Sequence, residues 1–184
     1  MPPRKRWKGP FSGSINRDSN PGTDPPLLTR TLYVRAVGLL ANRPFSTSEL
    51  KKKLLQSTSE EAIVRSVLDQ LMSHGYLNDR QYIERYVHSR RESKHFGRQR
   101  IEMELHLKGL DPSLVAEMLE HLYPPDEDLL ELRRSLEKKL RGLNLPMDAK
   151  KTARLYNYLL RQGFSRETTY REIRRRIKDV DLAE

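Results

Sequence analysis

The pattern of hydrophobic and polar positions is helical from about residue 30 onward. Apolar residues recur there at helical spacing, as at Tyr82, Ile83, Tyr86 and Val87, which share one helix face. No stretch shows the alternation that marks a half-buried strand. The pattern therefore predicts an all-α fold. We expect helices over residues 30–42, 47–56, 60–74, 79–94, 98–108, 112–122, 126–141, 148–162 and 166–178.

The apolar positions also repeat along the chain. The surroundings of Gly109 match those of Gly163, which lies 54 residues later, and Leu105 pairs with Leu159 in that register. A shift of 51 residues in the other direction gives a third copy, in which Leu54 pairs with Leu105. Because a unit of about 50 residues is marginally stable alone, we expect the copies to pack on one another. The register predicts three tandem three-helix repeats, at residues 29–77, 78–124 and 125–184.

Several expected helix boundaries carry capping signals. Ser46 and Glu49 have the spacing of a capping box. Asn78 is placed to cap the helix that begins at Asp79.

The joint around Gly109 combines a helix stop with a helix start. Gly109 suits the left-handed position after a helix, Asp111 suits an N-cap, and Pro112 suits the first helical position. Residues 161–165 repeat this joint around Gly163. Thr58 stands at the equivalent place of the first copy, so we expect that turn to differ.

Residues 1–28 have a different composition. Residues 1–26 contain 6 of the 11 prolines and few bulky apolar side chains, so they bury too little surface to offset the entropy of ordering. We predict a disordered, basic N-terminal tail. Two interpretations stay open for it: a flexible arm that touches nucleic acid, and a terminus with no role.

The composition excludes several classes of protein. The chain has no Cys, which excludes a disulfide-stapled domain, Cys-based zinc sites and Cys nucleophiles. Its five His residues form no HExxH motif, and neither an acidic cage nor a glycine-rich phosphate loop is present. We therefore predict a protein that is not an enzyme, with no catalytic, metal-binding or cofactor-binding residue and no small-molecule substrate. No apolar stretch approaches the ~20 residues that span a bilayer, so we expect a cytoplasmic protein without membrane contact.

Net charge points to the kind of partner. Lys and Arg number 35 against 25 Asp and Glu, which gives +10 at neutral pH. Basic residues concentrate in the spans 85–100 and 171–178, and such clusters suit DNA phosphates or an acidic protein surface. The alternative is a solvated face with i,i+4 pairs. The pairs expected in that case are Arg98–Glu102, Arg100–Glu104 and Glu172–Arg176. The candidate partner-binding or nucleic-acid-binding residues are Arg43, Arg85, Arg90, Arg91, Lys94, Arg98, Arg100, Arg161, Arg171, Arg174 and Arg175.

Four segments, in order along the chain, match the patterns of one protein family. Residues 41–54 resemble the family pattern R-x-x-S-x-x-E-L-x-x-K-L, and residues 75–82 resemble GYLDDxxF. Residues 96–110 resemble G-P-x-R-I-x-x-E-L-x-x-K-G-I, and residues 159–165 resemble LxxRGFS. Through these segments the chain resembles the RecX family of regulatory proteins, which act on the recombinase RecA. The resemblance covers about residues 31–178 and is weak over 124–146.

The chain departs from the family pattern at four positions. Asn78 replaces an Asp, and Gln162 replaces an Arg. His95 stands where the family often has Gly, and Arg98 where it often has Pro. The last two changes put the loop before residue 98 in question.

The resemblance implies a fold and a function. The fold is an elongated, curved array of three-helix repeats. The function is binding along the groove of the RecA–DNA filament, with single- or double-stranded DNA within reach, which limits recombinase and co-protease activity. The alternative is a stand-alone DNA-binding protein of helix-turn-helix type, since three-helix units also occur in such proteins.

Overall fold

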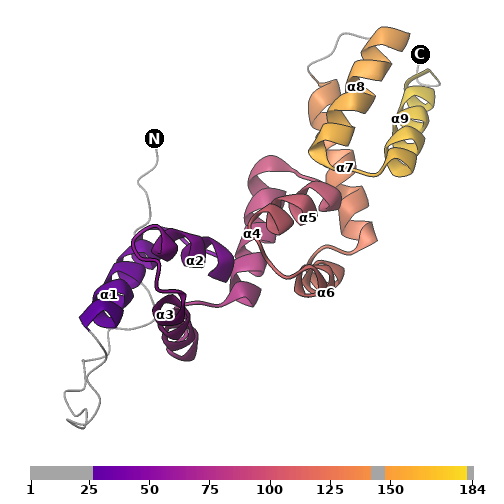
Figure 1. Ribbon diagram of the computed structural model, residues 1–184. Helices are drawn as coiled ribbons and strands as arrows, with labels where there is room; N and C mark the ends of the chain where they lie inside the picture. Colours follow the sequence, from indigo (N-terminus) through magenta and orange to yellow (C-terminus); the bar gives the residue numbers. More distant parts are fainter. Residues whose placement is uncertain (1–26, 142–147, 182–184) are drawn as a thin grey trace. The chain divides into compact units, whose positions relative to one another are not determined.

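The structure is a computed structural model that describes residues 27–141 and 148–181, with side chains described as far as residue 177. Its described residues form nine α-helices and no strand, which confirms the all-α prediction (Figure 1). Each expected boundary lies within three residues of the observed one. The helices are α1 (Leu27–Asn42), α2 (Thr47–Leu55), α3 (Glu61–Ser73), α4 (Asp79–Lys94), α5 (Arg98–Leu107), α6 (Pro112–Leu122), α7 (Pro125–Leu140), α8 (Ala149–Gln162) and α9 (Arg166–Asp181).

The N-terminal tail falls almost wholly outside the described residues. Residues 1–26 belong to that undescribed part, so the prediction of disorder there stays a prediction. Leu27 and Leu28, which were assigned to the tail, are the first residues of α1. Leu28 precedes Leu32 and Ala36 at helical spacing on one face, whereas Leu27 is 83% exposed.

Local capping signals set the helix starts as expected. The Ser46 hydroxyl accepts from the Glu49 N–H at 3.1 Å, and the Glu49 carboxylate accepts from the Ser46 N–H at 3.2 Å. Asp111 accepts from the N–H of Leu114 at 2.9 Å, and a proline occupies the first turn of α6. These contacts satisfy N–H groups that have no partner inside their helices.

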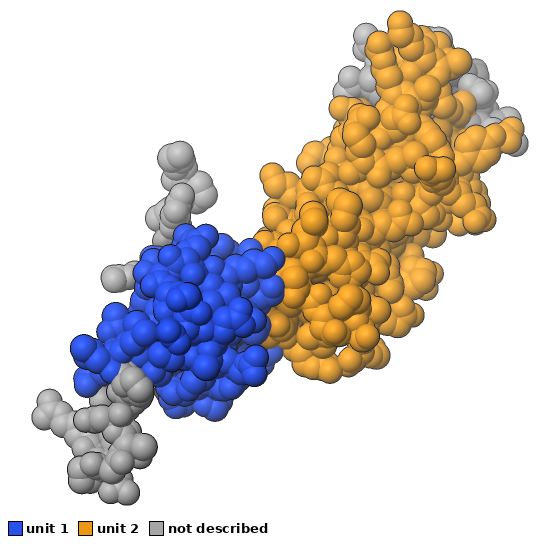
Figure 2. Space-filling model, in the orientation of Figure 1, with its two compact units in different colours: residues 1–78 blue, residues 79–184 orange. Residues whose placement is uncertain are grey.

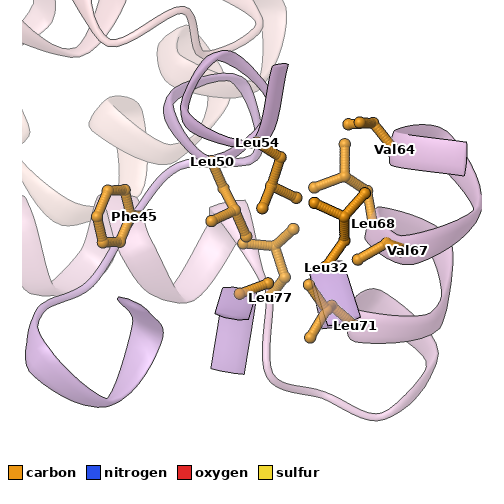
Figure 3. Close-up of a cluster of buried hydrophobic side chains, with 10 residues drawn as sticks. Leu32, Phe45, Leu50, Leu54, Val64, Val67, Leu68, Leu71 and Leu77 are labelled. Atoms are coloured by element: carbon orange, nitrogen blue, oxygen red, sulfur yellow. The ribbon is translucent and has the colours of Figure 1, made fainter. Parts of the chain in front are cut away.

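The chain divides into two compact units, residues 1–78 and 79–184 (Figure 2). The first unit contains one three-helix group, α1–α3, around a core in which the leucines and valines of all three helices meet (Figure 3). Its turn after α2 differs from the later ones, as expected, because Gln56 there is right-handed and no glycine ends the helix. Its buried core comprises Leu32, Ala36, Phe45, Leu50, Leu54, Val64, Val67, Leu68, Leu71 and Leu77.

The second unit contains two three-helix groups, α4–α6 and α7–α9, each with its own hydrophobic cluster. The predicted register is visible in their burial. Leu105 and Leu159 are both 0% exposed, and the equivalent pair Leu110 and Phe164 is buried as well. The three-helix repeat is therefore confirmed. The buried residues are Tyr82, Ile83, Val87, Ile101, Leu105, Leu110, Val115, Leu119 and Tyr123 in one cluster, and Leu132, Leu136, Leu155, Leu159, Phe164 and Ile173 in the other.

Backbone hydrogen bonds join these two groups. The N–H of Gly97, just before α5, donates to the carbonyl of Gln162 at 2.8 Å, and the N–H of Gln99 donates to the carbonyl of Gly163 at 3.2 Å. The free donors at the start of α5 thus meet the free acceptors at the end of α8, an arrangement that also aligns the two helix dipoles favourably.

Within the part of the chain that the structure describes, no helix is both long enough and apolar enough to cross a membrane.

Candidate interaction surfaces

The basic span 85–100 covers most of α4 and the beginning of α5. The helix α4 buries Tyr82, Ile83 and Val87 on one face. Arg85 and Lys94 are exposed, whereas the other four basic residues of the span are only partly exposed. These four are Arg90, Arg91, Arg98 and Arg100, and each of them contacts groups of the protein itself.

Arg90 and Arg100 converge on one carboxylate, that of Glu104. Arg90 Nε lies 3.1 Å and Arg100 Nε 3.2 Å from its two oxygens. The Tyr86 hydroxyl donates to Glu104 at 2.7 Å and accepts from Arg90 at 3.0 Å. Burial by itself would raise the pKa of Glu104, but the hydrogen bonds from Tyr86 and Arg100 and the arginine charges outweigh it and lower that pKa. The predicted pair Arg100–Glu104 is confirmed as part of a network between α4 and α5.

Arg91 ties α4 to the following elements. Its guanidinium donates to the carbonyl of Leu122 at 2.9 Å and to the carboxylate of Glu127 in α7. It also lies over the ring of Tyr123, 4.6 Å from the centroid. This arginine therefore holds the end of α6 and the first turn of α7 against α4.

Arg98 bonds through both its backbone and its side chain. Its N–H donates to Asp128 at 2.9 Å, which a proline at this position could not do. Its guanidinium donates to the carbonyl of Tyr123 at 3.1 Å and to Glu120 at 3.0 Å. Arg98 therefore pairs with Glu120 in place of the predicted Glu102, because the start of α5 faces the end of α6.

His95 forms the sharp turn between α4 and α5. Its φ is +52°, the one positive value among the described residues other than glycine, and it stands where the family pattern often has Gly. Its ring Nδ1 lies 3.0 Å from the buried carboxylate of Glu131, which also accepts from Arg134 at 2.6 Å. His95 thus contacts Glu131 while its backbone has the left-handed conformation, which L-residues seldom adopt.

Arg43, in the first unit, lies beside the start of α2. Its guanidinium stacks on the ring of Phe45, 3.7 Å from the centroid, and donates to the carbonyl of Pro44 at 3.1 Å. It is 3.7 Å from Glu49, and about half of its side chain is exposed. Arg43 therefore makes contacts within its own unit, and the exposed half of its side chain can still contact a partner.

The remaining candidates lie on the last two helices. Arg161 is exposed near the end of α8, and its carbonyl accepts from Arg100 at 3.0 Å. Arg171, Arg174 and Arg175 are exposed on α9. Arg174 lies over the ring of Tyr170 and donates to its hydroxyl at 3.3 Å. Tyr170 is not among the residues predicted from the sequence, although its large side chain is 56% exposed.

The predicted pair Glu172–Arg176 is replaced by contacts with α7. Glu172 is buried and accepts from Arg133 at 2.8 Å, and Arg176 lies 2.8 Å from Glu137. The hydrogen bond from Arg133 lowers the pKa of Glu172 despite its burial. These pairs surround a cavity of about 270 Å³ between α7 and α9. Its charged lining is already paired within the protein.

Among the described residues, no group of His, Asp and Glu side chains could hold a metal ion. The described residues therefore form structural ion pairs between α4 and α5 and between α7 and α9, with exposed basic side chains on α4, α8 and α9.

Comparison with known proteins places this geometry in a family. A family model described as "RecX, second three-helix domain" matches residues 78–119. The regulatory protein RecX of Leptothrix cholodnii is 34% identical over 144 residues, which cover 78% of this chain and 88% of that protein. The regulatory protein RecX of Trichlorobacter lovleyi is 31% identical over 134 residues, covering 72% and 86%. The crystal structure of RecX from Lactobacillus salivarius shares the fold, with a TM-score of 0.72 at 21% identity over 82% of this chain and 97% of that one.

Proposed function

This chain belongs to the RecX family of regulatory proteins, and from that premise we propose that it regulates the recombinase RecA. In this proposal it binds the RecA–DNA filament in the cytoplasm and limits recombinase and co-protease activity. It turns over no substrate and uses no cofactor. The observation that carries the proposal is family membership, which rests on relatives matched over most of their length.

The charge of the chain supports such a partner. A net charge of +10 favours encounter with a filament that carries DNA phosphates. We assign the contacts to exposed members of the predicted set, such as Lys94 and Arg161. Arg90, Arg91, Arg98 and Arg100 act through the fold, because each is bound to groups within the second unit.

The test is a titration of the purified protein into RecA on single-stranded DNA, with the DNA-dependent ATPase and strand exchange as readouts. We expect both to fall when the protein is present in amounts stoichiometric with RecA. Unchanged ATPase and strand exchange would refute the proposal.

A pair of variants tests the assigned contacts. Lys94→Glu with Arg161→Glu should weaken inhibition several-fold, because it reverses two exposed charges of the second unit. The matched control is Lys52→Glu with Lys53→Glu, which makes the same charge change at exposed positions of α2. Equal loss in both variants would mean that inhibition depends on overall charge rather than on these positions.

A further inference from the structure

The last helix of each three-helix group exposes an equivalent face, but the three faces differ in charge. On α6 the exposed positions follow a spacing of i, i+1, i+4, i+5, i+8 and i+9, which marks one side of a helix. The 54-residue register carries each of them onto an exposed position of α9. The face of α6 comprises Pro112, Ser113, Ala116, Glu117, Glu120 and His121; that of α9 comprises Arg166, Glu167, Tyr170, Arg171, Arg174 and Arg175.

The difference in charge between these faces is large. On α9 four arginines and an exposed tyrosine accompany one glutamate, whereas α6 presents Glu117 and Glu120 at the positions of Arg171 and Arg174. The equivalent face of α3 has one arginine, Arg65, against Glu61 and Asp69. The opposite faces of all three helices pack into hydrophobic cores. The basic face of α9 is therefore not a requirement of the repeat.

The acidic residues near this face do not neutralise it. Glu172 is only 6% exposed and is directed toward α7, where it binds Arg133. Arg175 is 4.0 Å from Glu172, and its side chain is still 61% exposed. Arg174 contacts Tyr170 rather than a carboxylate. Glu167 is the single carboxylate on the described face, so the face keeps an excess of positive charge.

The connection between α8 and α9 has the length and the glycine of a helix-turn-helix turn. Residues 163–165 separate the two helices, Gly163 is left-handed with φ of +94°, and Ser165 accepts from the N–H of Thr168 at 3.1 Å. A three-residue turn with glycine is typical of the helix-turn-helix motif, whose second helix enters the major groove. The α8 helix contains no Asp or Glu. A duplex that reached α9 would therefore meet no acidic residue on α8.

We propose that α9 is a DNA-binding helix that docks in the major groove of duplex DNA. Arg166, Arg171 and Arg174 contact phosphates, and Tyr170 lies toward the base edges. At a rise of about 1.5 Å per residue the face from residue 166 to residue 175 is about 14 Å long, which is comparable with a major groove about 12 Å wide. This activity requires no RecA, so it goes beyond the function proposed above.

The test measures binding of the full-length protein to a fluorescent duplex of arbitrary sequence, without RecA, at several salt concentrations. The variant Arg166→Ala, Arg171→Ala, Arg174→Ala should bind at least about tenfold more weakly at moderate salt. The slope of log K against log salt should shrink by about 2.7, because each phosphate contact contributes about 0.9. Alanine favours helix, so circular dichroism should show unchanged helical content.

A matched control removes the same number of charges elsewhere. The variant Lys52→Ala, Lys53→Ala, Arg65→Ala changes exposed positions of α2 and α3. It should bind duplex DNA within about twofold of the unaltered chain, because only side chains that contact phosphates contribute to the salt-dependent part of the affinity. Tyr170→Ala should weaken binding while leaving the salt slope unchanged, because it removes no charge.

Three outcomes would overturn the inference. These are unaltered binding by the α9 variant, an equal loss in the control, and a preference of more than tenfold for single-stranded DNA of the same length, which would replace groove docking by strand binding. Failure here is distinguishable from failure of the RecA proposal, because the duplex assay contains no RecA and the ATPase titration uses the unaltered chain.

Discussion

The backbone of Gly97 lies directly against the backbone of Gly163. A β-carbon at Gly97 would collide with the carbonyl group of Gly163 and would lie 2.7 Å from a ring carbon of Phe164. The hydrogen bond from Gly97 to the neighbouring Gln162 carbonyl, at 2.8 Å, depends on this approach. The joint between the two groups of the second unit is therefore a backbone contact that only glycine permits.

Gly97→Ala should lower the free energy of unfolding by about 1–3 kcal/mol, the usual range for overpacking a closely packed site. The cause is steric, because the φ of Gly97, −71°, is open to any residue. Urea unfolding followed by circular dichroism measures the effect.

Gly38→Ala is the control for this substitution. Gly38 lies in α1, and a β-carbon there would meet nothing within 4 Å. Alanine should therefore stabilise the helix by about 0.5–1 kcal/mol. A Gly97→Ala variant as stable as Gly38→Ala would contradict the proposed collision.

Gly163→Val should destabilise the protein more than Gly109→Val. Both glycines are left-handed, with φ of +94° and +71°, so both valines incur a conformational cost of about 1–2 kcal/mol. At Gly163 the new β-carbon would also lie 2.5 Å from the backbone nitrogen of Arg100. Thermal melts of the two variants are compared, and equal melting temperatures would contradict the added steric collision with Arg100 at Gly163.

His95→Gly should be more stable than His95→Ala, by about 1–2 kcal/mol, because glycine relieves the left-handed conformation and alanine retains it. Both substitutions lose the contact between His95 and Glu131, so that contact cancels in the comparison. Chemical unfolding of the two variants side by side measures the difference. An alanine variant at least as stable as the glycine variant would show that residue 95 is not strained.

Glu104→Gln should reduce stability by about 1.5–3 kcal/mol at neutral pH, because hydrogen bonds to the charged carboxylate are weakened. The pKa of Glu104 is lowered in the folded protein, so its contribution is fully present above its ordinary value of 4.5 and is lost as the pH falls through the folded value. The gap between the unaltered chain and the variant should therefore shrink below pH 4.5.

Glu84→Gln serves as the comparison, because Glu84 is exposed on α4. Its effect on the free energy of unfolding should stay within about 0.5 kcal/mol at neutral pH. If the stability difference between the unaltered chain and Glu104→Gln grew as the pH fell, the charged form of Glu104 would not be the form that stabilises the fold.

Local features of the sequence were sufficient to predict the helices and the repeat. The capping box at Ser46, the stop at Gly109 and the N-cap at Asp111 act over a few residues and lie where the sequence placed them. The departure from the family pattern at His95 put the loop before α5 in question, and His95 forms that turn with a φ of +52°. Helix geometry places residues four positions apart on one face, and this spacing correctly predicted the pair Arg100–Glu104. Packing between helices replaced the other two predicted pairs, Arg98–Glu102 and Glu172–Arg176.

The sequence could not show which basic residues remain available to a partner. Arg91 meets Glu127, and Arg133 meets Glu172, across separations that no helical spacing relates. Nor could it show that Gly97 and Gly163 touch. What the sequence alone determined is the series of helices, their caps and their threefold repetition. Tertiary structure decided which charges are paired and which face of α9 stays basic and exposed, because ion pairing depends on how helices pack and not on the order of residues along the chain.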